Sequence, residues 1–173
     1  GLPTKVEQSD LNLALKGRHG DCPVPVLAIR NPSSAFETTL KAIEMMIRFQ
    51  TPIFLMSDAL IANGSELWEI PNLEPRHFEL YKSDKPFNRS EDSLVRPWTD
   101  IGQSGINYIA GGLEKDYSSG QISYEGDNHQ KMVETRFNKI MKMSEYIPDC
   151  ILEQDSSAGG TLILSWGSTY GAV

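Results

Sequence analysis

The stretch Pro23-Val-Pro-Val-Leu-Ala-Ile29, followed by an amphipathic segment and then by Ile53-Phe-Leu-Met56, decides the fold of this 173-residue chain. Both short runs are almost wholly apolar, which is typical of strands buried on both faces of a parallel sheet. Pro25 has no backbone N–H to donate, so we expect it at the start of its strand or on a sheet edge. An apolar run, a helix and a second apolar run predict a right-handed βαβ unit of the α/β class.

The segment between the two runs predicts a helix over Ser34–Gln50. Ser34 and Glu37 have the S/T-x-x-E spacing of a capping box, in which each side chain bonds a backbone N–H at the helix start. Apolar residues recur at the spacing of one helix face, which we expect to be buried: Phe36, Leu40, Ile43 and Ile47.

Two further helices are predicted, one on each side of this unit. Thr4 and Glu7 match a capping box, so a helix is expected to start at Thr4 and to stop at Gly17. A third helix is expected over about residues 128–146, where Asp127 with Gln130 predicts the cap. Its predicted apolar side ends before Pro148 and contains Val133, Phe137, Ile140, Met141 and Ile147.

Regularity fades between residues 60 and 128, where prolines, glycines and scattered charges alternate with aromatic residues. So long a structureless loop is unusual inside a compact domain, and we interpret the region as an arm that packs on other parts of the protein. The apolar run Thr161–Trp166 predicts one more strand, with a glycine-rich turn over residues 167–171 after it. Both ends are expected to be cut, because a helix opens at once and another should begin after Val173.

Composition narrows the class of protein. With 39% hydrophobic and 23% charged residues, the chain has the balance of a globular protein. A net charge of −7 argues against nucleic-acid binding, and no apolar run approaches the roughly 20 residues that span a bilayer. No leader peptide is visible, so we expect a cytoplasmic protein without a membrane partner. Cys22 and Cys150 are expected to be reduced thiols, with a disulfide between them as the alternative.

Few residues are candidates for chemistry. His19, His77 and His129 show no metal-ligand spacing, and two cysteines cannot hold an iron–sulfur cluster that needs four thiolates. Residues 167–171 approach the G-x-S-x-G nucleophile motif, but the central residue is threonine; alternatively, the turn could approach a phosphate. Thr4 is the exception, because a hydroxyl at a helix N-terminus either caps the helix or faces an anion such as a carboxylate.

The segment Gly1-Leu-Pro-Thr-Lys-Val-Glu-Gln-Ser-Asp10 resembles the L/M-P-T-K-x-E-Q-x-D signature of the α subunit of 2-oxoacid:ferredoxin oxidoreductases. The likeness continues in order along nearly the whole chain. Further matches are Gly17–Gly20, Leu60–Glu66, Arg96-Pro-Trp98, Gly111–Lys115, Asn128-His129, Arg136 and Trp166–Gly171. The chain is therefore identified as a fragment of such a subunit, most similar to the 2-oxoglutarate type. A pyruvate or branched-chain 2-oxoacid enzyme and a non-catalytic binding or scaffold domain are the alternatives.

The resemblance implies oxidative decarboxylation of a 2-oxoacid to an acyl-CoA and CO2, with electrons passed to ferredoxin. The complete enzyme would use thiamine diphosphate, Mg²⁺ and a [4Fe-4S] cluster, with a β subunit as partner, and this chain alone would bind none of these cofactors and be inactive. It implies that residues 1–80 are the end of a pyrimidine-binding domain, 81–157 a connecting arm, and 158–173 the start of a transketolase-C-terminal-like domain. No catalytic residue is assigned, and Thr4 is the implied contact for the substrate carboxylate.

Overall fold

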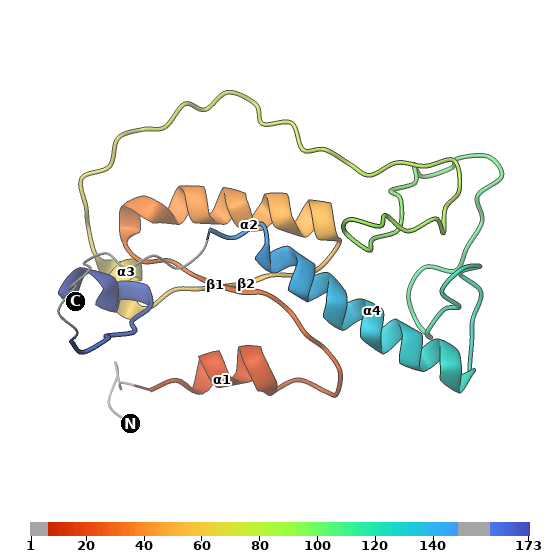
Figure 1. Cartoon of the computed structure of the whole chain (residues 1–173). Helices are drawn as coiled ribbons and strands as arrows, with labels where there is room; N and C mark the ends of the chain where they lie inside the picture. Colours follow the sequence, from red (N-terminus) through yellow and green to blue (C-terminus); the bar gives the residue numbers. More distant parts are fainter. Residues whose placement is uncertain (1–6, 149–159) are drawn as a thin grey trace.

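A computed structural model describes residues 7–148 and 160–173 of the chain. Strands β1 (Val26–Ala28) and β2 (Phe54–Met56) pair in parallel, with Val26 opposite Phe54. Helix α2 (Ala35–Phe49) joins them and runs along one side of the pair (Figure 1). The carbonyl of Pro25 accepts the N–H of Phe54 at 3.0 Å, so this proline stands at the strand start as expected. The predicted βαβ unit of an α/β fold is confirmed.

Helix α2 begins differently from the prediction. A short 3-10 turn, η1 (Pro32–Ser34), precedes it, and Asn31 caps that turn reciprocally with Ser34. Asn31 Oδ1 accepts the Ser34 N–H at 3.2 Å, and Ser34 Oγ accepts the Asn31 N–H at 3.3 Å. The predicted capping box of Ser34 with Glu37 is therefore wrong, because the Ser34 hydroxyl serves the preceding turn. The Glu37 carboxylate instead pairs with Arg76 at 2.9 Å.

One hydrophobic cluster holds the early and late parts of the chain together. Met45 and Phe49 of α2 pack with Val95 of the irregular segment and with Met143 of α4 (Gly126–Ser144). None of these four side chains is more than 2% exposed. The ring of Tyr146 meets Phe49 edge-on, with centroids 5.1 Å apart. Burial of such side chains is the main stabilising term of a fold, so this cluster fixes α4 against α2.

The prediction of which surfaces are buried needs correction. In α2 the buried residues are Ala42, Met45 and Phe49, because this side faces α4 and the irregular segment. The predicted face, consisting of Phe36, Leu40, Ile43 and Ile47, is only half-buried. The strands are not buried on both faces either, since β1 is half-buried and the Phe54 side chain is 41% exposed. A pair of strands leaves more surface uncovered than the interior of a wide sheet does.

Helix α1 (Ser9–Lys16) lies on the opposite side of the strands from α2 in Figure 1. It does not extend back to Thr4 as predicted: Glu7 and Gln8 lie outside the helix, and the Glu7 carboxylate accepts the Ser9 hydroxyl at 2.7 Å. Thr4 itself falls outside the described residues. The predicted end at Gly17 is confirmed, and its N–H donates to the Leu13 carbonyl at 3.0 Å.

The irregular region is confirmed over most of its predicted length. The short helix α3 (Ala59–Asn63) was not predicted; between it and α4 the regular pairing is a single bridge from Lys115 to Ile122. This segment runs over α2 and then down to the start of α4 (Figure 1). Within the part of the chain that is described, no helix is long and apolar enough to cross a membrane.

Helix α4 matches the predicted helix to within two residues at each end. Its N-cap is Glu125, without a side-chain cap bond, so the predicted cap by Asp127 is wrong. Its predicted apolar side is also partly wrong, since Phe137 and Met141 are 56% and 53% exposed, whereas Met143 is buried. The C-terminal end of α4 lies beside α2, and its earlier turns run away from α2 (Figure 1).

The predicted strand Thr161–Trp166 is not formed in this chain. These residues have no ladder partner, and Leu162, Ile163 and Leu164 are 75%, 63% and 91% exposed. A strand requires a neighbour to bond its backbone N–H and C=O groups, and no described segment lies beside this one as a strand. The 3-10 helix η2 (Gly167–Ala172) follows it.

Candidate functional site

Asp58 lies directly after β2, at the carboxyl edge of the strand pair, where open α/β sheets usually bind ligands. Its Oδ1 accepts the N–H of Ile61 at 3.1 Å and thereby caps α3. Its Oδ2 accepts the N–H of Ser168 at 3.0 Å. Hydrogen bonds from Ser168 and Ile61 hold the pKa of Asp58 below its ordinary value. The C-terminal segment is thereby tied to the carboxyl edge of the strand pair.

Glu66 closes the neighbouring loop over the turn after β1. Its carboxylate accepts the Ser33 N–H at 2.8 Å and the Asn31 side-chain amide at 3.1 Å. Its pKa is lowered, chiefly by the backbone N–H of Ser33. Both carboxylates at this edge are therefore used to hold the chain's own turns in place.

The residues that the sequence offers as candidates for chemistry do not come together in one site among the described residues. In the turn over residues 167–171, the Thr169 hydroxyl donates to the Trp166 carbonyl at 2.6 Å, and the Ser168 N–H serves Asp58. This turn therefore presents neither a free nucleophile nor an open phosphate loop. The Cys22 thiol is free and exposed, and Cys150 lies outside the described residues. His129 pairs with Glu114, and among the described residues no group of three His, Cys, Asp or Glu side chains could hold a metal ion.

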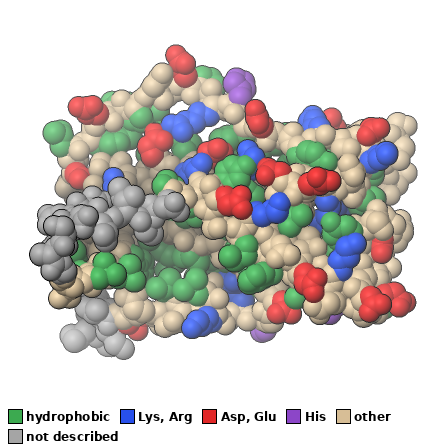
Figure 2. All heavy atoms as spheres, in the orientation of Figure 1, with side chains coloured by type: hydrophobic (Ala, Val, Ile, Leu, Met, Phe, Trp, Pro, Cys, Tyr) green, Lys and Arg blue, Asp and Glu red, His purple; other side chains and the backbone are tan. Residues whose placement is uncertain are grey.

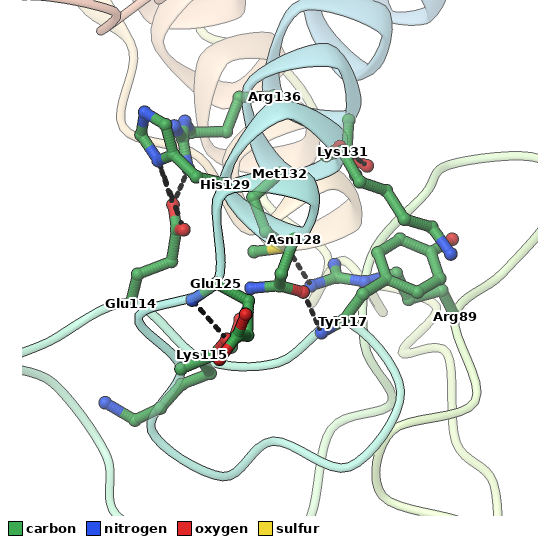
Figure 3. A network of polar contacts seen from close by, with 12 residues as sticks. Arg89, Glu114, Lys115, Tyr117, Glu125, Asn128, His129, Lys131, Met132 and Arg136 are labelled. Carbon is green, nitrogen blue, oxygen red and sulfur yellow. Dashed lines mark hydrogen bonds and ion pairs between the residues drawn. The ribbon is translucent and has the colours of Figure 1, made fainter.

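A polar network joins the loop after residue 110 to the first turns of α4 (Figure 3). Glu114 Oε2 accepts from Arg136 Nη1 at 3.2 Å, and Glu114 Oε1 lies 3.2 Å from Nδ1 of His129. Asn128 Oδ1 accepts the Tyr117 N–H at 2.9 Å, while its Nδ2 donates to the Lys115 carbonyl at 3.1 Å. Four bonds thus fix this loop against one face of the helix.

The turn that follows is stabilised by Asp116. Its Oδ1 accepts the N–H of Ser119 at 2.7 Å and that of Ser118 at 3.1 Å, together with both hydroxyls. These donors, Ser119 first, lower the pKa of Asp116 to about 2. The Asp116 carboxylate is consequently ionised and committed to its own turn.

A cleft of about 460 Å³ opens between this loop, the irregular segment and α4. We call it the basic cleft, because five cationic side chains line it and, among the described residues of its lining, only Glu114 and Asp116 are acidic. The five are Arg89, Arg96, Lys115, Arg136 and Lys139. Burial, followed by the charges of Arg89, Arg96 and Arg136, lowers the pKa of Lys139 to about 8.

Sequence reasoning missed the basic cleft. Its cations are spread over fifty positions of an irregular segment and a helix, and no local spacing links them. The available signal was the set of family-like matches that included Arg96, Lys115 and Arg136. Those matches do not indicate that the three side chains lie close together in the folded chain.

A second cleft of about 440 Å³ lies between the end of α1 and α4. Leu15 and Pro23 line it on one side, and Val133 and Phe137 line it on the other. Arg18 supports its rim by donating to the carbonyls of Ala14 and Cys22. Hydrophobic side chains are gathered in the region of the strands and the C-terminal segment in Figure 2.

Comparison with known proteins gives a consistent result. The family described as pyruvate flavodoxin/ferredoxin oxidoreductase, thiamine diphosphate-binding, matches residues 1–139. The 2-oxoglutarate oxidoreductase subunit KorA of Mycobacterium tuberculosis is 42% identical over all of this chain and 27% of its own length. The 2-oxoglutarate synthase subunit KorA of Archaeoglobus fulgidus is 34% identical over 98% of this chain and 42% of its own length. The chain thus spans less than half of each of these relatives.

A solved structure has the same fold. The 2-oxoglutarate:ferredoxin oxidoreductase from Magnetococcus marinus, with 2-oxoglutarate, coenzyme A and succinyl-CoA bound, superposes with a TM-score of 0.75 at 28% identity. The superposition covers 99% of this chain and 31% of that one.

Proposed function

Because the chain belongs to the pyruvate flavodoxin/ferredoxin oxidoreductase family, we propose that it is part of the α subunit of a 2-oxoacid:ferredoxin oxidoreductase. The complete enzyme would decarboxylate a 2-oxoacid oxidatively, form the acyl-CoA and CO2, and pass electrons to ferredoxin. The observation that carries the proposal is the likeness to the Magnetococcus marinus enzyme along 99% of this chain, by both sequence and fold.

The proposed substrate is 2-oxoglutarate. Support comes from the 42% and 34% identical relatives, both of which are named for 2-oxoglutarate. Relatives named only for 2-oxoacids, such as the α subunit from Saccharolobus solfataricus at 27% identity, keep pyruvate and branched-chain 2-oxoacids as alternative substrates. Thr4 remains our proposed contact for the substrate carboxylate.

Thiamine diphosphate is the proposed cofactor of the complete enzyme, with Mg²⁺ and a [4Fe-4S] cluster beside it. The described residues do not fit a diphosphate–Mg²⁺ site. Asp58, the carboxylate at the strand edge, is committed to Ile61 and Ser168, and Glu66 is committed to Ser33. A magnesium site needs oxygen ligands that are free to coordinate the ion. We therefore propose that these cofactors are held by other parts of the α subunit and by a β subunit.

Domain limits and partners complete the proposal. We propose that residues 1–80 close the pyrimidine-binding domain, that 81–157 form the connecting arm, and that 158–173 open a transketolase-C-terminal-like domain. The irregular backbone between α3 and α4 supports an arm in the middle. The proposed partners are the β subunit, ferredoxin, the 2-oxoacid and coenzyme A, in a cytoplasmic heteromer.

The test is a substrate panel. The complete α subunit, purified with its β subunit, is assayed for viologen reduction in the presence of coenzyme A and thiamine diphosphate. We expect the largest kcat/KM with 2-oxoglutarate, and a much smaller value with pyruvate and 3-methyl-2-oxobutanoate. Higher values with either of the others would overturn the substrate, and activity with none of the three would favour a non-catalytic binding or scaffold domain.

A further inference from the structure

The basic cleft carries an excess of positive charge that the described residues do not balance. Its five cations face two carboxylates, although the whole chain has a net charge of −7. Asp116 is bonded within its own turn, and Glu114 is shared between His129 and Arg136. Like charges gathered in a partly dry site repel one another, so such a cluster costs stability unless an anion enters it.

The cations are held in place by contacts that leave their charge available. Arg89 donates to the Leu94 carbonyl at 3.0 Å and lies over the Tyr117 ring, 4.9 Å from its centroid. Arg96 lies over the rings of Phe87 and Tyr108, at 5.8 and 5.6 Å. Neutral carbonyls and aromatic rings orient a guanidinium group but do not neutralise it. These two arginines are therefore preorganised for an anion.

A hydrogen-bond donor also remains open in the basic cleft. Lys139 makes no hydrogen bond or ion pair with any described residue, and it is half-buried beside three arginines. Partly buried donors normally find an acceptor, so the unpartnered ammonium group of Lys139, which lines the cleft, indicates a ligand that supplies acceptor oxygens.

We propose that the basic cleft binds a phosphate group of a small phosphorylated molecule. A phosphate offers several acceptor oxygens and more than one negative charge, which suits forked guanidinium groups beside an ammonium. A single carboxylate would leave much of the charge excess in place. The overall charge of −7 disfavours a nucleic-acid backbone, and a concave site of about 460 Å³ has the size of a small-molecule pocket.

Two sources of the phosphate are separated by the choice of probe. Pyrophosphate represents a free diphosphate, and coenzyme A represents a diphosphate that is part of a larger ligand. Pantetheine, which has the thiol arm without phosphate, is the negative probe. The coenzyme A arm rests on the proposed function, whereas the pyrophosphate arm does not, so failure of one is distinguishable from failure of the other.

The experiment is calorimetric titration of the complete α/β complex, loaded with thiamine diphosphate and held in a phosphate-free buffer. Lys139→Gln and Arg96→Gln remove cleft charges, and Lys142→Gln is the matched control on the same helix, since Lys142 bonds the Glu91 carbonyl outside the cleft. We expect pyrophosphate or coenzyme A to bind, with affinity lowered ~10-fold or more by each cleft variant and unchanged by the control.

The outcomes decide as follows. Coenzyme A binding that the cleft variants weaken and the control does not assigns the cleft to the nucleotide end of that ligand. Pyrophosphate binding weakened in the same way, with coenzyme A binding unaffected, assigns it to a free diphosphate. Binding of neither, or binding that Lys139→Gln and Lys142→Gln weaken equally, overturns the proposal. Melting temperatures measured in parallel verify folding, and Lys139→Gln is expected to fold because it relieves repulsion.

Discussion

Asp58 Oδ2 accepts the backbone N–H of Ser168 at 3.0 Å and so joins two residues that lie 110 positions apart in the chain. One carboxylate thereby caps α3 with its first oxygen and secures η2 with its second. This bond connects the strand unit to the segment that we propose opens the next domain.

Replacing Asp58 with alanine should therefore loosen both contacts. We expect a loss of about 1 kcal/mol of stability, the usual cost of removing an N-cap side chain. Hydrogen exchange at the Ser168 amide should become faster, which mass spectrometry of the complete protein can follow. Asp84→Ala, at an exposed loop aspartate, is the control and should change neither quantity. Unchanged protection at Ser168 would show that this bond does not secure the segment.

Two methionines on α4 give a matched pair for the core. Met143 is 1% exposed in the cluster with Phe49, whereas Met141 is 53% exposed. We expect Met143→Ala to cost about 2 to 5 kcal/mol, because it removes buried contacts and leaves a cavity. Met141→Ala should stay within about 0.5 kcal/mol. Urea unfolding of this chain measures both, and equal losses would place the core elsewhere.

Lys139 makes stability depend on pH in the alkaline range. Its pKa in the folded chain, about 8, lies below its ordinary value of 10.5, first because of burial and then because of Arg89, Arg96 and Arg136. Below pH 8 the side chain is charged in both states, and the full penalty is present. Between pH 8 and 10.5 the folded state loses the proton first, so stability rises with pH. Glu114 also faces the cleft but does not offset this effect, since it is bound to Arg136.

Lys139→Gln removes this penalty. We expect the variant to have a larger free energy of unfolding than the unaltered protein at pH 7, by about a few kcal/mol at most, since each pKa unit is worth about 1.4 kcal/mol. It should therefore melt at a higher temperature. The difference should shrink as the pH approaches 10.5. Thermal melts in phosphate-free buffers at several pH values measure it. A variant that is less stable at pH 7 would mean that the ammonium is favourably paired.

Local patterns in the sequence were sufficient for the strand–helix–strand unit. The apolar runs and the helical spacing between them are set by neighbouring residues, so they survive in any context. The predictions of helix caps were wrong, because several nearby side chains compete for the backbone N–H groups at each helix start. Ser34 bonds Asn31 and not the start of the predicted capping box, and Glu125, not Asp127, is the N-cap residue of α4.

The basic cleft and the true core could not be predicted, because they depend on distant segments meeting. Val95 lies in an irregular stretch whose sequence has no periodicity, yet its side chain packs against Met45 and Met143 in the core. The prediction of a strand over Thr161–Trp166 was wrong because a strand needs a partner strand, and the described residues supply none for this segment. Its exposed leucines show how far pattern alone can mislead.

Thr4 lies outside the described residues, and its role remains a prediction that kinetics can test in the complete enzyme. Loss of a hydrogen bond to a charged carboxylate costs about 1.5 to 3 kcal/mol, so Thr4→Ala should lower kcat/KM by roughly 10- to 100-fold. Thr4→Ser keeps the hydroxyl and should retain most activity. A helix cap predicts instead about 1 kcal/mol of lost stability with nearly unchanged kinetics. A change in kcat/KM below about twofold would refute the substrate contact.

The most direct test of the proposed function is detection of the product. The complete α subunit, together with its β subunit, is incubated with 2-oxoglutarate, coenzyme A, thiamine diphosphate and oxidised ferredoxin, and succinyl-CoA is measured by mass spectrometry alongside ferredoxin reduction. We expect succinyl-CoA to accumulate in step with reduced ferredoxin, and both to vanish when the β subunit or coenzyme A is omitted. Ferredoxin that stays oxidised and no acyl-CoA from 2-oxoglutarate, pyruvate or a branched-chain 2-oxoacid would contradict the assignment.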